Sequence, residues 1–194
     1  PPVARAPMIC MIRTLMESDG DITMVTTGPM TNLGMAIRME PRIVPKIKRI
    51  VLMGGAYTNG NVTPAAEFNI IADADAAYVC FTSGRPITMI GLDVTRKALC
   101  YPSIVDRMDK IGNKASKLFV DLMRHFCKSQ KEVFGWEGGP LHDPITIAWL
   151  IDPSVVETKP MHAEIDIRSV QSYGRTNCDF FGYQKLEPNA DVGI

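Results

Sequence analysis

Short apolar runs rich in β-branched residues alternate along the chain with longer stretches whose apolar positions recur at helical spacing. Three runs, Ile22–Thr26, Ile50–Met53 and Ile87–Ile90, each end at a glycine or a turn, which is typical of strands. Strands near 22–26, 49–53 and 87–91, separated by helical stretches, favour parallel pairing with helices on both faces. The pattern therefore predicts an α/β fold: an open, doubly wound, mostly parallel central sheet covered by helices.

Capping residues and apolar spacing predict the bounds of the helices. Asp143 followed by Pro144 is a strong helix start, because aspartate caps the free N–H groups and proline suits the first helical position. Helices are expected from Met8 to Met16, from Thr31 or Asn32 to Met39, from Asp73 to Gly84, from Pro102, from Asn113 to Lys131 and from Pro144. Alternating polarity over Met161–Val170 predicts one further strand.

The composition is that of a globular protein. Of 194 residues 46% are hydrophobic, which excludes a disordered or low-complexity chain, and 21 basic residues balance 21 acidic ones. No basic run is present to bind nucleic acid or an anionic membrane, and no apolar stretch reaches the ~20 residues of a membrane span. Without a pattern resembling a signal peptide, we expect a cytoplasmic protein.

The cysteines point to packing rather than to covalent or metal chemistry. They are widely spaced, odd in number and form no Cys-x-x-Cys or Cys/His pattern. We therefore expect small core residues rather than disulfide partners at all five positions. These are Cys10, Cys80, Cys100, Cys127 and Cys178.

Both ends of the chain have the character of interior segments. Residues 1–7 include no initiator methionine and lead directly into an amphipathic helix, and Ala190–Ile194 ends in an extended apolar pattern. Domains usually finish on polar, frayed residues. We therefore expect residues 1–194 to form a single α/β domain that is incomplete and truncated at both ends.

Polar residues follow the predicted strands, where open α/β sheets bind their ligands. Thr27-Gly28, Gly54-Gly55 and Gly91-Leu92-Asp93 each come directly after a strand. The segment Asn61–Asn69 after the second strand has no helical or strand period and carries two amides and a carboxylate. It is either a site for the hydroxyls of a sugar or a loop of solvated polar residues.

Two further features allow a chemical or a structural interpretation. His142-Asp143 pairs an imidazole with a carboxylate, which suits proton transfer or metal binding, although a helix-capping role explains Asp143 equally well. Thr27 offers a hydroxyl and a carbonyl to a hard cation, but it is also an ordinary turn residue. The chain pattern leaves these alternatives open.

Taken together, these segments resemble the calcium-dependent nucleoside hydrolases, the inosine-uridine-preferring family and its pyrimidine-preferring bacterial branch. The likeness covers almost the whole chain, and its combination of motifs is specific where no single motif is. The matching stretches are Thr27–Asn32, Ile50–Gly55, Gly60–Asp73, Gly91–Thr95, Gly138–Asp143 and Tyr173–Thr176.

The resemblance implies hydrolysis of the N-glycosidic bond of ribonucleosides to ribose and free base, as part of purine and pyrimidine salvage. It implies that Asp143 and the Thr27 carbonyl bind Ca²⁺, and that His142 gives a proton to the departing base. It also implies a substrate site formed by Met53, Asn61, Glu67, Phe68, Asn69 and Gln130. Phe134 stands where pyrimidine-preferring members have a tyrosine, so the sequence leaves the base preference open.

The larger departure from the family is an absence. The family's Asp-x-Asp-x-x-x-Asp-Asp motif, which supplies most calcium ligands and the base that activates water, does not occur before Thr27. The calcium site would then be incomplete in this chain, which would hold roughly the C-terminal two-thirds of a nucleoside hydrolase. The alternative is a catalytically dead riboside-binding or assembly module. The resemblance also implies a homodimer or homotetramer, with no nucleic-acid or membrane partner.

Overall fold

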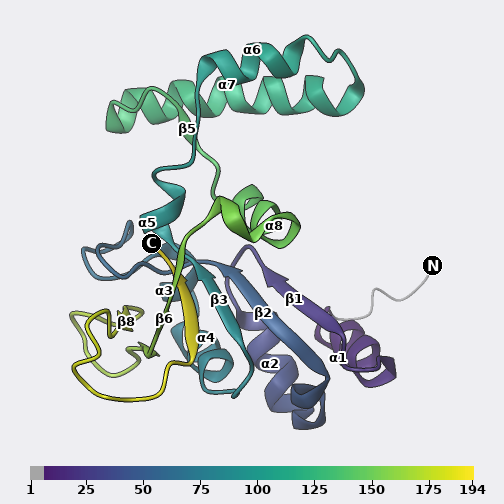
Figure 1. Ribbon diagram of the computed structural model, residues 1–194, viewed down its shortest axis with the longest axis vertical. Helices are drawn as coiled ribbons and strands as arrows, with labels where there is room; N and C mark the ends of the chain where they lie inside the picture. The colour runs from purple at the N-terminus through teal and green to yellow at the C-terminus, as the bar shows by residue number, and fades with distance from the viewer. Residues whose placement is uncertain (1–6) are drawn as a thin grey trace. The chain divides into compact units, whose positions relative to one another are not determined.

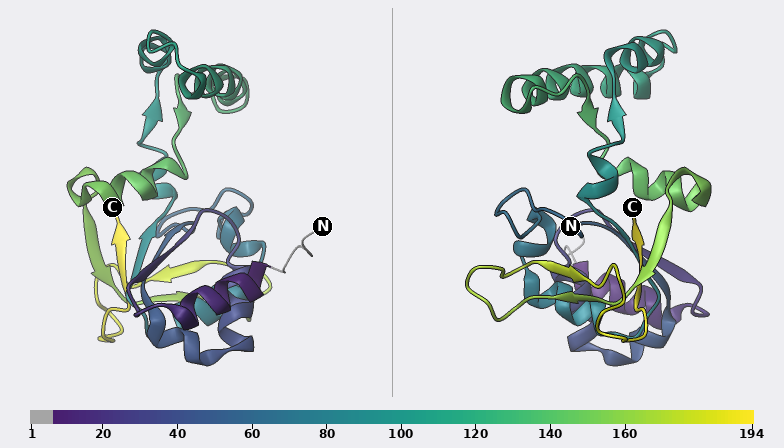
Figure 2. Two further views of the ribbon diagram at one scale, coloured as in Figure 1. Left: turned by 90° about the vertical axis from the view of Figure 1, so that its right-hand side faces the viewer. Right: turned by 60° about the vertical axis from the view of Figure 1, so that its left-hand side comes forward.

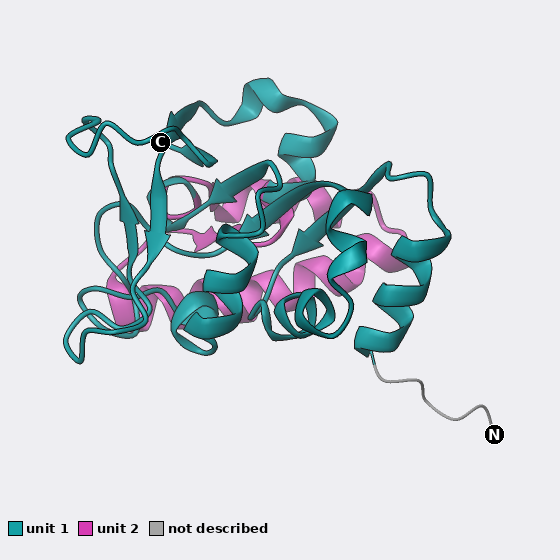
Figure 3. Ribbon diagram, turned by 90° about the horizontal axis from the view of Figure 1, so that it is seen from below, with its two compact units in different colours: residues 1–94, 146–194 teal, residues 95–145 magenta. Residues whose placement is uncertain are grey.

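The computed structural model describes residues 7–194. Residues 1–6, part of the segment interpreted above as interior to a longer chain, lie outside the described residues. The chain folds into two compact units, residues 1–94 with 146–194, and residues 95–145 (Figure 3). Compactness does not decide whether the units unfold together, so a single domain stays a prediction.

The first unit is built on a five-stranded sheet (Figure 1). Its order is β1 (Ile22–Thr26), β2 (Ile47–Met53), β3 (Ile87–Ile90), β9 (Ala190–Gly193) and β6 (Thr158–Met161). Pairing is parallel from β1 to β9, and β6 is antiparallel to β9. The mostly parallel sheet and its first three strands are confirmed, and the extended C-terminal segment is the strand β9.

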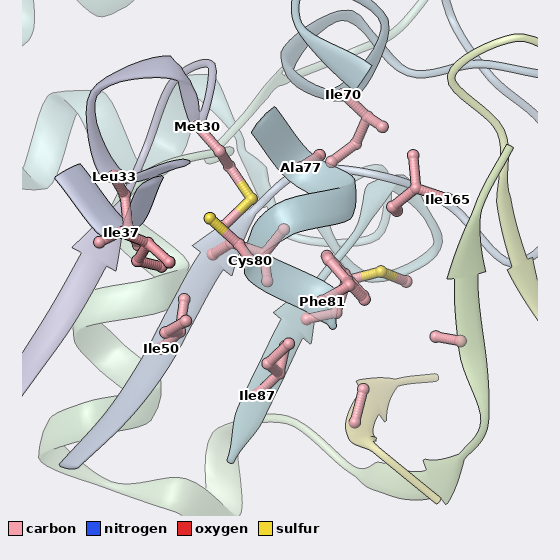
Figure 4. Close-up of a cluster of buried hydrophobic side chains, with 14 of the residues drawn as sticks. Met30, Leu33, Ile37, Ile50, Ile70, Ala77, Cys80, Phe81, Ile87 and Ile165 are labelled. Atoms are coloured by element: carbon pink, nitrogen blue, oxygen red, sulfur yellow. The ribbon is translucent and has the colours of Figure 1, made fainter. Parts of the chain in front are cut away.

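One face of this sheet carries the main core. It is covered by α1 (Pro7–Glu17), α2 (Thr31–Met39) and α4 (Ala74–Phe81). In Figure 4, Ile50 and Ile87 project from the sheet toward Cys80 of α4. The two helices α2 and α4 approach closely at Gly34, where a Cβ atom would lie 2.8 Å from the Cβ of Ala76. Only glycine fits this crossing.

A helix also lies against the opposite face. Arg49 precedes the core residue Ile50, so its side chain projects to the other side of the sheet. There its guanidinium carbon lies 5.4 Å from the ring centroid of Trp149, in α8 (Pro144–Ile151). The remaining elements around this unit are η1 (Pro41–Lys46), α3 (Phe68–Ile71), α5 (Leu92–Thr95), η2 (Pro153–Val155), β7 (Ala163–Ile165) and β8 (Thr176–Cys178).

The second unit pairs two helices with a short ribbon. The antiparallel strands β4 (Leu99–Cys100) and β5 (Gly139–Pro140) lie beside α6 (Pro102–Asp109) and α7 (Lys114–Phe134), which run along each other (Figure 2). Asn113 begins α7 as expected, since its side chain accepts a hydrogen bond from the backbone N–H of Ser116. The small core of this unit consists of Cys100, Val105, Val120 and Met123.

The predicted strand Met161–Val170 is wrong. The chain instead forms β6 and β7, which belong to different sheets and are separated at His162. The side chain of Asn189 bonds both the N–H and the C=O of Ala163. The carboxylate of Asp166 then accepts backbone N–H groups of the following residues and turns the chain. These side-chain contacts, not the alternation of polarity, decide the path.

Smaller differences concern helix ends and cysteines. Met30, not Thr31 or Asn32, precedes α2 as its cap residue, and the Thr31 hydroxyl donates to Asp73 instead. Helix α4 ends at Phe81 rather than at Gly84, and α7 continues to Phe134. All five cysteines are free, as expected, but Cys10 is exposed and is not a core residue. Among residues 7–194, no helix has the length and apolar character needed to cross a membrane.

Candidate active site

The carboxyl ends of β1, β2 and β3 lie at one edge of the sheet because the strands are parallel. The loops after β2 and β3 are joined there through the backbone: Gly54 N–H donates to Ile90 (3.3 Å), and Leu92 N–H donates to Gly55 (2.9 Å). A Cβ atom on Gly91 would lie 2.7 Å from the Gly55 oxygen. Glycine at 91 therefore lets the two loops touch.

The carboxylate of Glu67 is held at this edge. Glu67 caps α3, and its Oε2 accepts the backbone N–H groups of Asn69 (2.9 Å) and Ile70 (3.3 Å). The same oxygen accepts the N–H of Gly55 from the loop after β2 (2.9 Å). Only 3% of Glu67 is exposed. Three N–H groups thus fix the orientation of this carboxylate at the end of β2.

Asn69 joins three segments of the chain. Its side-chain Nδ2 donates to the main-chain oxygen of Met53 (3.0 Å) and lies 3.5 Å from that of Thr27. Asn69 is 8% exposed and Met53 is buried. The structure therefore brings together the predicted residues Thr27, Met53, Glu67 and Asn69.

Asn61 and Phe68 form the outer part of this arrangement. The Asn61 Oδ1 accepts the backbone N–H of Phe68 (2.9 Å), and Phe68 is 55% exposed. The turn between them is ordered by Thr63, whose hydroxyl accepts the N–H groups of Ala65 and Ala66. The segment is thus structured, and its residues Glu67 and Asn69 do not have the character of a solvated loop.

His142 and Asp143 belong to the second unit. The Nδ1 of His142 lies 2.8 Å from the hydroxyl of Thr95, which is fully buried. Burial lowers the pKa of His142; the Asp143 carboxylate opposes this shift and the Arg96 guanidinium adds to it. Loss of hydration raises the pKa of Asp143, and His142 opposes that shift. Helix α8 begins at Pro144, directly after Asp143, as predicted.

The two positions that the resemblance assigns to the base lie on α7. Gln130 is half-buried, and Phe134 stands one helical turn further on. Phe134 is 58% exposed, and its ring stacks on that of Trp136 with 5.0 Å between centroids. The first and second units hold different parts of the predicted site.

The donor set fits calcium only in part. The Thr27 carbonyl and the Asp143 carboxylate are hard oxygen donors of the kind Ca²⁺ prefers, but the ion takes six to eight oxygens. Within the described part of the chain, no group of three or more His, Cys, Asp or Glu side chains is placed to hold a metal ion.

Comparison with protein families identifies the family of this chain. The model of the inosine-uridine preferring nucleoside hydrolases matches residues 2–194. The chain belongs to this family.

Nucleoside hydrolases similar to this chain include bacterial and plant proteins. The pyrimidine-specific ribonucleoside hydrolase RihB of Shigella flexneri is 50% identical over 184 residues, which are 95% of this chain and 59% of RihB. A purine-preferring ribonucleoside hydrolase from Gardnerella vaginalis has 35% identity and a TM-score of 0.87, over 96% of this chain and 60% of that one. A plant nucleoside hydrolase, PpNRh1, has 27% identity and a TM-score of 0.89, over 100% and 63%. The chain thus spans about three-fifths of the length of these hydrolases.

The sequence pattern gave no role to three residues around the candidate nucleoside hydrolase site. Thr95 bonds His142, and Asp93 accepts the backbone N–H of Tyr57 (2.7 Å) in the loop after β2. Thr176 bonds Ala56 in the same loop. All three residues lie in stretches that carry the resemblance, but only the folded chain shows what their side chains contact.

Proposed function

We propose that the protein containing this chain hydrolyses the N-glycosidic bond of ribonucleosides and releases ribose and free base. The observation that carries this proposal is the buried pair Glu67 and Asn69, fixed at the carboxyl ends of β1 and β2 in a member of the nucleoside hydrolase family. Such ends are where open α/β sheets bind ligands. A fixed carboxylate and a fixed amide suit the vicinal hydroxyls of a ribose ring.

In this proposal the first unit binds the sugar. Glu67, Asn69 and Asn61 hydrogen-bond the ribose hydroxyls, and Met53 and Phe68 lie beside the ring. These contacts accelerate hydrolysis when they strengthen as the ribose flattens toward an oxocarbenium-like transition state. Because Glu67 is already oriented by three N–H groups, it needs little reorganisation when substrate arrives.

The second unit acts on the base. We assign to His142 the donation of a proton to the departing base, which removes the negative charge that develops on it. Thr95 engages Nδ1 of this ring, which leaves Nε2 for the base. Gln130 would contact the base. The similar hydrolases include pyrimidine-specific and purine-preferring proteins, so the proposal covers ribonucleosides as a class.

Asp143 and the Thr27 carbonyl would contribute to a calcium site. When bound there, Ca²⁺ supplies a positioned water of lowered pKa as the nucleophile. Two donors are too few for this ion, so the proposal requires further oxygen ligands. We also propose a cytoplasmic homodimer or homotetramer that serves purine and pyrimidine salvage, supported by the family resemblance and, for association, by exposed apolar residues of α8 such as Ile147 and Ile151.

Binding of the separate parts of a nucleoside tests the sugar site first. Calorimetric titration with uridine, inosine, ribose and uracil should show binding of both nucleosides and of ribose. Asn69→Asp, which places a carboxylate against the Met53 carbonyl, should weaken the binding of both nucleosides about equally. Val62→Ala, an exposed change in the same segment, serves as the control. Uracil binding without ribose binding, or no binding of either nucleoside, would contradict the proposal.

A further inference from the structure

The hairpin of β7 and β8 reaches the loop after β2 through a single threonine. The Thr176 hydroxyl accepts the N–H of Ala56 (2.9 Å) and donates to the C=O of the same residue (2.5 Å). Thr176 is 2% exposed. One buried hydroxyl thus satisfies both backbone groups of a residue that precedes it by 120 positions.

This contact leads directly to Glu67. Ala56 follows Gly55, whose N–H donates to the Glu67 carboxylate (2.9 Å). Gly55 has a φ of +72°, and a Cβ atom there would lie 2.7 Å from the Thr176 methyl carbon. The hydroxyl of Thr176 therefore holds Ala56 while its methyl group packs on Gly55. Thr176 thus contacts both the residue whose N–H donates to Glu67 and the residue that follows it.

The same hairpin also contacts the other end of the loop. Gly174, with a φ of +80°, approaches α3 so closely that a Cβ atom would lie 2.8 Å from the Cα of Ile71. The hydroxyl of Tyr173 donates to Asp75 of α4 (2.8 Å). The stretch Tyr173–Thr176 has no role in the proposed function. It contacts the chain both before and after the segment that carries Glu67 and Asn69.

We propose that Thr176 is a positioning residue of the ribose site: through Ala56 and Gly55 it sets the orientation of the Glu67 carboxylate. The ligand in this inference, a ribonucleoside, rests on the proposed function. Thr176 itself does not touch the substrate. Its part is to hold the loop so that Gly55 presents its N–H to Glu67, which lies 12 residues further along the chain.

Three variants separate positioning from general stability. Thr176→Val keeps the shape but removes both hydrogen bonds, and Thr176→Ser keeps the hydroxyl. Asp166→Asn is the matched control, because Asp166 orders the turn between β7 and β8 through Arg168, Ser169 and Ser172 and has no bond to Ala56. Should the valine variant not fold, Thr176→Ala removes the same hydroxyl with a smaller side chain.

The readouts are uridine affinity and the backbone amide resonances of Asn69 and Ile70. Both amides bond Glu67 and are remote in sequence from Thr176. We expect Thr176→Val to weaken uridine binding about tenfold, the size of one or two lost hydrogen bonds, and to shift both resonances. The uridine affinity of Thr176→Ser should stay within about twofold of the wild-type value. Asp166→Asn should lower the melting temperature yet leave affinity and both resonances in place.

Two results would overturn the inference. One is a Thr176→Val variant whose Asn69 and Ile70 resonances do not shift. The other is an Asp166→Asn variant that loses as much uridine affinity as Thr176→Val does. If the wild-type chain binds no uridine, the proposed function fails, and the resonances alone still decide whether Thr176 orients Glu67.

Discussion

The side-chain amide of Asn69 donates to the main-chain oxygen of Met53 over 3.0 Å and so ties α3 to the end of β2. The same nitrogen lies 3.5 Å from the Thr27 oxygen, at the end of β1. A single amide therefore connects two neighbouring strands to the short helix that carries it. Asn69, which the proposal assigns to ribose, is therefore also a structural link. Each of these two roles can be tested separately.

Replacing the Asn69 amide should destabilise the first unit. In Asn69→Asp a carboxylate faces two carbonyl oxygens in a buried position, and we expect a loss of roughly 1–3 kcal/mol in the free energy of unfolding. Urea denaturation measures this loss. Asn61→Asp is the stability control, because its Oδ1 still accepts the Phe68 N–H. Equal stability of the two variants would show that the contacts of Asn69 contribute little.

The crossing of α2 and α4 should not tolerate a methyl group. Gly34→Ala would place its Cβ 2.8 Å from that of Ala76, with the Ala76 backbone equally near. We expect a loss of roughly 1–3 kcal/mol, typical of overpacking in a core. Gly28→Ala meets nothing within 4 Å and has no positive φ, so it should be close to neutral. A melting curve of Gly34→Ala that matches the wild type would contradict this account of the crossing.

Acid should weaken the first unit through Glu40. Hydrogen bonds from the Arg42 side chain lower the pKa of Glu40 from its ordinary 4.5 to about 2. A carboxylate with a depressed pKa stabilises the fold above the unfolded value, and this stabilisation is lost as the pH falls from about 4.5 to about 2. Glu40→Gln should therefore be less stable than wild type at pH 7, and the difference should disappear toward pH 2.

Thermal melts of wild type and Glu40→Gln between pH 2 and pH 7 measure this difference. Glu137→Gln, at an exposed glutamate, controls for the general loss of a negative charge. A gap between Glu40→Gln and wild type that stays constant over this range would mean that the pair with Arg42 does not contribute through ionisation.

Asp143→Asn should separate metal binding from folding. Asparagine is as good a helix cap as aspartate, so the helix that begins at Pro144 should persist and the melting temperature should change little. The negative charge that a hard divalent cation selects is lost. We expect calcium affinity and ribose release to fall together by at least about tenfold. An asparagine variant that keeps both would reduce Asp143 to a helix cap.

Local patterns predicted the parts of the fold that depend on local chemistry. The β-branched runs predicted β1, β2 and β3, and Asp73 and Asn113 cap α4 and α7 as expected. The pattern failed where a distant side chain decides the path, as Asn189 does at Ala163. The predicted cap of α2 was wrong for the same reason, since Thr31 donates to a residue 42 positions away.

The candidate site shows the same limit. The resemblance supplied Glu67, Asn69 and His142 with roles, but it could not show what holds them. Thr95 lies 47 residues from His142, and Thr176 lies 120 residues from Ala56. Such pairs leave no periodic signal in the sequence, because each depends on how separate elements pack.

Ribose release is the measurement that tests the central claim most directly. The purified protein, supplied with calcium and with uridine or inosine, should release ribose and free base in equal amounts. His142→Ala should lower this release about a hundredfold or more, a hundredfold being the lower end of what general acid–base catalysis contributes. A folded wild-type protein that binds uridine and calcium yet releases no ribose from either nucleoside would contradict the account.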